Sequence, residues 1–278
     1  MSKSLAVHII SSVLSFIMMI CISVLVLIIC LALTLFNVGF ITYKMDDAYY
    51  IAAIASLNNT LKDEIAPPSG FPEKVFDNLF NKGVIQEDSI ACVKSIMLGL
   101  DLSYDHSRVR QLLMDRFTQF AEQNNMSLNN NNLESLTDYC IEEYERQIVI
   151  SYLKSFAPVK RTFDRYFTYA LLSFSALLIL TALFLFRIQK FKHRGVRYSI
   201  YSLFASSLLI IPLPLIFLIH GGYTKVNIMP EHVKMLFVSM MRSTLLSVLL
   251  GGLIVAAIGF LLILLTNRMR EKLIYRHK

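Results

Sequence analysis

Charged residues are scarce in this sequence. Only 17% of its 278 residues are Asp, Glu, Lys or Arg, whereas soluble domains typically carry about 25%. The shortfall falls in four stretches that hold no such residue: Leu5–Tyr43, Tyr166–Phe186, Tyr198–Ile219 and Ser243–Asn267. A helix needs roughly 20 apolar residues to cross the hydrocarbon layer, and each stretch is long enough. We therefore predict an all-α integral membrane protein with four transmembrane helices.

The sequence also lacks the motifs of common enzymes. It holds no HExxH, GxSxG or P-loop pattern, so we predict no catalytic residue, no cofactor and no metal. Ion-coupled carriers place carboxylates or cations inside the membrane, but His8 is the only charged residue or histidine in the four stretches. We infer a non-enzymatic protein. A membrane enzyme and a coupled carrier are the alternatives.

The basic residues mark one side of the membrane. Five lie in the short loop 187–197, namely Arg187, Lys190, Lys192, Arg194 and Arg197. Short basic loops stay in the cytoplasm, so these five residues set the topology, with both termini inside. The net charge of +7 then reflects membrane edges, where anionic lipid attracts each cation by about 1 kcal/mol. We predict no binding to nucleic acid.

That topology divides the chain into four parts: 1–44, the cytoplasmic start and first span; 45–165, an extracytoplasmic helical domain; 166–267, spans two to four; and 268–278, a basic cytoplasmic tail. The inner loop 187–197 joins spans two and three, and the outer loop 220–242 joins spans three and four. We place the protein in the cell membrane with residues 45–165 outside.

Apolar residues of the outer domain recur at helical spacing and predict a bundle of about five helices. The first helix should stop at the proline cluster 66–72, and Asp88 should cap a later one. The last helix should begin near Leu133, and Pro158 should kink or break it. Its segment Glu142–Arg146 has one residue too few for the EExxxR box of membrane-embedded CAAX-type proteases. We therefore interpret this segment as a solvated acidic helix face.

Two cysteines, Cys92 and Cys140, are the only ones in the outer domain. A pair of cysteines outside the cytoplasm is typical of a disulfide. The alternative is two buried free thiols on neighbouring helices.

Span four carries a run of small residues: Ser243, Ser247, Gly251, Gly252, Ala256 and Gly259. Small residues at such spacing let helix backbones approach closely. We predict a packing seam here, with the serine face of span three (Ser199, Ser202 and Ser206) as its candidate partner, against the alternative of chance in a span rich in small residues. Pro212 and Pro214 should kink span three.

These features favour a membrane anchor that presents a helical binding, sensing or scaffolding domain. Its partners would be the lipid bilayer and another membrane or envelope protein, or a second copy of the chain. The order of spans and loops also resembles that of FtsX-type ABC permeases, in topology and without a motif. That resemblance implies a subunit of a transport or export complex. Such permeases have an amphipathic helix before span one and a longer inner segment, whereas here four residues precede Leu5 and the inner loop is short.

The topology predicts which introduced cysteines react from outside the cell. In intact cells, a membrane-impermeant maleimide should label a cysteine placed at Ser127 and spare one placed at Lys192, because only the outer domain faces the reagent. Labelling at Lys192 would overturn the orientation.

Overall fold

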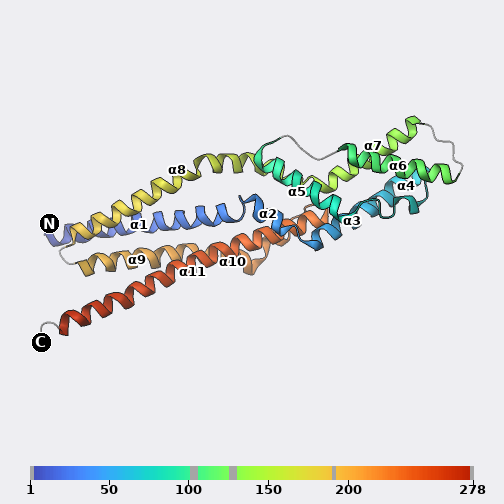
Figure 1. Cartoon of the computed structure of the whole chain (residues 1–278). Helices are drawn as coiled ribbons and strands as arrows, with labels where there is room; N and C mark the ends of the chain where they lie inside the picture. Colours follow the sequence, from blue (N-terminus) through green and yellow to red (C-terminus); the bar gives the residue numbers. More distant parts are fainter. Residues whose placement is uncertain (1–2, 101–105, 125–129, 190–191, 276–278) are drawn as a thin grey trace. The chain divides into compact units, whose positions relative to one another are not determined.

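The computed structural model describes residues 3–100, 106–124, 130–189 and 192–275, and these residues form helices with no β-strand (Figure 1). Within them, four helices are long and apolar enough to cross a membrane: Leu5–Leu33, Ser151–Ile188, His193–His220 and Glu231–Asn267. The predicted all-α class is confirmed for this part of the chain. The four helices support a multi-pass membrane protein.

The chain divides into two compact units. Unit 1 comprises Met1–Asn37, Asp164–Lys225 and Met240–Lys278, and unit 2 comprises Val38–Phe163 and Val226–Ser239. Two of the four boundaries fall inside long helices, α8 (Ser151–Ile188) and α11 (Glu231–Tyr275). Unit 2 therefore holds most of the predicted outer domain together with part of the predicted outer loop 220–242.

Unit 1 contains the following further elements: α1 (Lys3–Leu33), α9 (Lys192–Ile210), α10 (Pro212–His220) and the short η3 (Gly222–Thr224). Helices α1 and α9 pack along each other (Figure 1). Hydroxyls tie them together, because Ser15 Oγ donates to the Tyr198 carbonyl at 3.0 Å and Ser202 Oγ donates to the Ser15 carbonyl at 2.9 Å. Ser202, one of the three serines on the predicted face of span three, thus contacts α1.

Span three divides into two helices next to Pro212, with Ile211 between them in helical conformation, and the kink there stays a prediction. Helix α9 ends at Ile210 and α10 begins at Pro212. Proline has no backbone N–H to continue the helical ladder. The division between α9 and α10 is therefore a direct consequence of the sequence.

The small residues of α11 lie against two helices. An added Cβ at Gly251 would meet Val26 Cγ1 of α1 at 2.8 Å, and one at Gly252 would meet Ile211 Cγ1 at 2.8 Å. The Cys30 thiol of α1 also donates to the Ser247 carbonyl at 3.4 Å. Gly259 lies against α9, next to Leu203 and Phe204, and Ser243 and Ala256 are half-buried. The close approach falls at the glycines, and Ser202 of span three contacts α1 instead.

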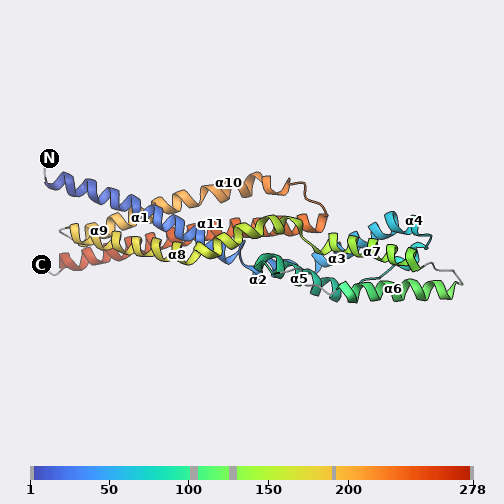
Figure 2. The same cartoon turned by 90° about the horizontal axis from the view of Figure 1, so that it is seen from above.

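Unit 2 is built from short helices: α2 (Val38–Lys44), α3 (Asp47–Thr60), the π-helical η1 (Leu61–Ile65), α4 (Ala66–Ser69), the 3₁₀-helical η2 (Glu73–Phe76), α5 (Lys82–Leu98), α6 (His106–Gln123) and α7 (Asn130–Ile148). Figure 2 shows α6 and α7 side by side, as does Figure 1. The ring of Phe71 packs on Phe117 and Phe120 of α6, with centroids 5.5 and 5.8 Å apart. These rings join α6 to the segment after α4.

The start of α11 is fixed to the rest of unit 2 through a buried histidine. His232 Nε2 lies 3.1 Å from the Gln147 carbonyl oxygen, and its ring meets the Tyr49 ring edge-on at 5.1 Å. A carbonyl can only accept a hydrogen bond, so Nε2 carries the proton. The part of the predicted outer loop that begins α11 is thus a component of this helical unit.

Two predicted helix boundaries are wrong. Asp88 does not cap a helix, because α5 begins at Lys82 and Asn81 Oδ1 caps it by accepting from the Gly83 N–H. Asp88 is instead buried, and its carboxylate accepts from the Tyr144 hydroxyl at 2.5 Å. The last outer helix ends at Ile148, and Pro158 lies inside α8. A proline removes one helical hydrogen bond, but here the helix continues past it.

The first helical run of the outer domain ends within the proline cluster 66–72, as predicted, after one π-helical turn. The Ala66 N–H donates to the Leu61 carbonyl five residues back, which makes one π-helical turn. Pro67 and Pro68 then sit in the first turn of α4, where their missing N–H groups cost little. The chain leaves the helix at Gly70, whose φ of 73° is a left-handed conformation that suits glycine. The helix is therefore reshaped at residues 61–65, and its last residue, Ser69, lies three residues after Ala66.

Enlarging Gly252 should loosen unit 1. We expect Gly252→Leu to lower the unfolding free energy by about 1–3 kcal/mol. The larger side chain would overlap the β-branched side chains of Ile210 and Ile211 and force the helices apart. Thermal unfolding in detergent micelles measures it. Ala257→Leu, at an exposed position of the same helix, is the matched control and should change little. Equal stability of both variants would contradict the seam.

Candidate functional site

The residues predicted to set the topology lie around the junction of α8 and α9. Arg187 is in the last turn of α8, and Arg194 and Arg197 are exposed in the first turns of α9. Lys190 and the side chain of Lys192 lie outside the described residues. The role of these cations in orientation stays a prediction.

Cys92 and Cys140 are free and fully buried in the structure, on α5 and α7. This is the second of the two arrangements that the sequence allows. Burial raises the pKa of the Cys92 thiol to about 12, with the nearby Asp88 carboxylate adding to the effect. Burial likewise raises the pKa of Cys140 to about 12. Both thiols are therefore neutral near pH 7 and unsuited to nucleophilic chemistry, because the thiolate is the reactive form.

A groove in unit 2 is a candidate binding site. Its volume is about 750 Å³, which falls in the range of ligand pockets. One wall comes from the end of α3, the π-helical turn, α4 and the residues just after it: Thr60, Glu64, Ile65, Pro68, Ser69 and Phe71. The other wall is one face of α7. The π-helical turn displaces the first wall from regular helix, as such turns often do at functional sites.

The α7 wall is a single stripe along the helix. Asn132, Ser135, Tyr139, Glu142 and Arg146 recur every three or four residues and all line the groove. At 1.5 Å per residue, the fourteen steps from Asn132 to Arg146 span about 21 Å. The groove is therefore elongated along α7.

The two ends of the groove differ in polarity. Toward the start of α7, the buried side chains of Leu133, Leu136 and Phe71 line it. Toward the end of α7, it is lined by Glu142, Glu143 and Arg146. The ring of Tyr139 lies between these groups along α7 and is 63% exposed. An occupant would thus meet an apolar part and a charged part.

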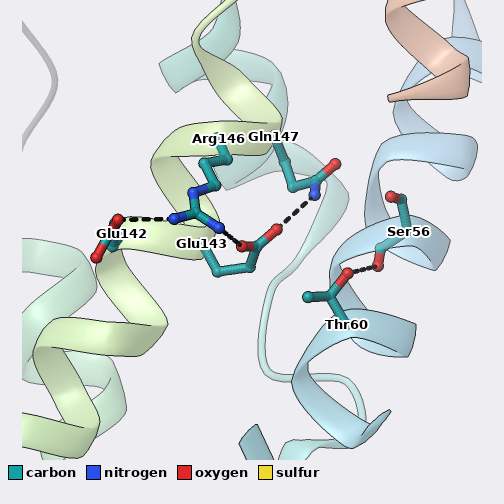
Figure 3. A network of polar contacts seen from close by, with 6 residues as sticks. All are labelled: Ser56, Thr60, Glu142, Glu143, Arg146 and Gln147. Atoms are coloured by element: carbon teal, nitrogen blue, oxygen red, sulfur yellow. Dashed lines mark hydrogen bonds and ion pairs between the residues drawn. The ribbon is translucent and has the colours of Figure 1, made fainter. Parts of the chain in front are cut away.

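Figure 3 shows how the charged end is held together. Arg146 Nη2 donates to Glu142 Oε1 at 2.8 Å, and its Nη1 donates to Glu143 Oε2 at 3.2 Å. Gln147 Nε2 donates to the other oxygen, Glu143 Oε1, at 2.8 Å. The hydrogen bond from Glu142, together with both carboxylate charges, raises the pKa of Arg146 above its usual range.

Glu143 corrects the interpretation of Glu142–Arg146 as a solvated face. Only Glu142 and Arg146 are exposed, while Glu143 is 8% exposed and Tyr144 is fully buried. Burying a carboxylate is costly unless it is paired and hydrogen-bonded, and both Glu143 oxygens have donors. The sequence gives no direct signal for this, because the donors matter only once the helix is packed.

The groove offers mostly hydrogen-bond acceptors. The hydroxyls of Thr60, Ser69 and Ser135 each donate to a backbone carbonyl of their own helix, at 3.1, 2.8 and 2.9 Å. A hydroxyl whose proton is used in this way can only accept from a ligand. The carboxylates of Glu64, Glu142 and Glu143 are also acceptors. Within the described residues no ion pair joins Glu64 to another side chain.

The carboxylates of the groove outnumber its cations. The groove is lined by three carboxylates, those of Glu64, Glu142 and Glu143, and by one guanidinium, that of Arg146. The guanidinium already pairs with Glu142 and Glu143. The groove therefore suits a ligand that carries positive charge and hydrogen-bond donors. In the described part of the chain, no cluster of His, Cys, Asp and Glu could hold a metal.

No family model, no curated protein and no solved structure matches the chain. The chemistry of the groove therefore rests on its own residues.

The buried thiols predict the alkylation behaviour of the protein. At pH 8, well below their pKa of about 12, Cys92 and Cys140 should resist maleimide in the native protein. After denaturation without reductant, intact mass should show all four cysteines alkylated. A mass short by two groups, restored by reductant, would instead establish the Cys92–Cys140 disulfide.

Proposed function

We propose that this chain is a non-enzymatic, multi-pass protein of the cell membrane that presents unit 2 outside the cytoplasm to bind a partner. The observation that carries the proposal is the groove between α7 and the α3–η1–α4 segment. It is of ligand size and combines apolar, aromatic and charged groups. Pockets with these features are the default binding sites of proteins.

The membrane helices supply the setting for this function. The stretches that would cross the membrane contain no Asp, Glu, Lys or Arg. Ion and proton pathways through membranes use charged side chains of this kind. Recognition is therefore assigned to unit 2, where the chain concentrates its acidic side chains. The basic loop 187–197 supports an orientation with unit 2 outside, because basic loops are retained in the cytoplasm.

The proposal is tested by photo-crosslinking in intact cells. A photoreactive phenylalanine analogue at Tyr139, inside the groove, should give a discrete crosslinked species in the full-length chain. The same analogue at Glu134, which is exposed on α7 and does not line the groove, is the control and should give none. Equal crosslinking from both positions, or none from either, would contradict binding in the groove.

The resemblance to permeases gives the alternative, a subunit of a transport or export complex. Purification from membranes in mild detergent separates the two. Stable association with an ATPase would favour the transport subunit, and its consistent absence would favour the binding module.

A further inference from the structure

We propose that the groove binds a short cationic peptide segment in which a Lys or Arg lies close to an apolar side chain. This proposal rests on the proposed function and names the class of partner. The partner would be a peptide or an exposed segment of another protein with this pattern.

The charge of the groove favours a cationic occupant. With Glu64, Glu142 and Glu143 against Arg146, the groove carries two more negative than positive groups. The charge of Arg146 is already offset by two carboxylates, because Glu142 and Glu143 each accept a hydrogen bond from one of its terminal nitrogens. A ligand cation would gain Glu64 and the free oxygen of Glu142 as partners. Charge complementarity of this kind steers binding and selects partners.

The second argument is the supply of donors and acceptors. Three hydroxyls in the groove have already donated their protons to backbone carbonyls. An ammonium, a guanidinium or a peptide N–H can donate to them, whereas a carboxylate or phosphate would meet oxygen atoms that offer no proton. Ser135 is exposed and Thr60 and Ser69 are half-buried, so a ligand in the groove would meet their oxygens as acceptors. The groove therefore discriminates against acidic ligands in two independent ways.

The third argument is length and shape. The α7 stripe spans about 21 Å, and an extended chain rises about 3.3 Å per residue. About six residues would fill the groove, which is more than a small amine could occupy. Leu133, Leu136 and Phe71 would contact an apolar side chain, and the exposed ring of Tyr139 could lie against the cation. These groups together fit a peptide.

Direct titration tests the inference. The full-length chain in nanodiscs of zwitterionic lipid is titrated with a fluorescein-labelled hexapeptide of alternating Lys and Leu, and binding is followed by anisotropy. Matching Glu–Leu and Gly–Ser hexapeptides and empty nanodiscs serve as references. We expect saturable binding of the Lys–Leu peptide alone, weakening as salt is raised, because exposed charges are screened within about 10 Å at 0.1 M salt.

Matched variants locate the binding. The double variant Glu64→Gln/Glu142→Gln should lower the affinity about tenfold, while Glu134→Gln, which removes one carboxylate of α7 outside the groove, should leave it unchanged. Arg146→Gln should raise the affinity for the Lys–Leu peptide, because it makes the groove more negative. Thermal unfolding of each variant establishes that it is folded.

The outcomes separate this inference from the proposed function. Preference for the Glu–Leu peptide, or loss of Lys–Leu binding in Arg146→Gln with the fold intact, would overturn the cationic partner and leave a binding groove. Failure of all peptides, with the crosslink at Tyr139 still present in cells, would also overturn the peptide chemistry alone. Absence of the crosslink as well would overturn both.

Discussion

The cost of placing charge in hydrocarbon is the constraint on which this molecule depends. Four uncharged stretches fill the membrane-spanning helices, so the charged side chains that could recognise a partner lie elsewhere in the chain. Inside unit 1, short-range polar contacts such as Ser15 with Ser202 and close glycine contacts at Gly251 and Gly252 hold helices together. Packing and neutral hydrogen bonds are the interactions that lipid leaves to membrane helices.

Unit 2 follows a different balance. It buries carboxylates, but each is satisfied by a donor from its own unit: Asp88 by the Tyr144 hydroxyl, and Glu143 by Arg146 and Gln147. The exposed carboxylates Glu64 and Glu142 then remain at the groove to interact with an occupant. Structural and recognition roles are thus divided between neighbouring acidic residues of one helix, since Glu142 faces outward and Glu143 inward.

The sequence predicts the spans well because their signal is additive along the chain: each apolar residue contributes, and no distant partner is needed. The helix boundary before Pro212 also follows from the local sequence, because Pro212 has no backbone N–H to donate. The groove could not be predicted in this way. The burial of Glu143 depends on packing between helices, the partner of Asp88 lies 56 residues away, and the π-helical turn at Leu61–Ile65 has no pattern of its own. The acidic residues of Glu142–Arg146 are visible in the sequence, but their spacing alone predicts a solvated helix face.

The central claim is that α7 and the α3–η1–α4 segment form one cleft for a cationic peptide. Hydrogen–deuterium exchange of the full-length chain in nanodiscs tests it most directly. Saturating Lys–Leu hexapeptide should slow amide exchange in both walls, at Glu64–Phe71 and at Tyr139–Gln147, and leave the span Tyr166–Phe186 unchanged. Protection of neither wall, or protection confined to α5 and α6, would contradict the account.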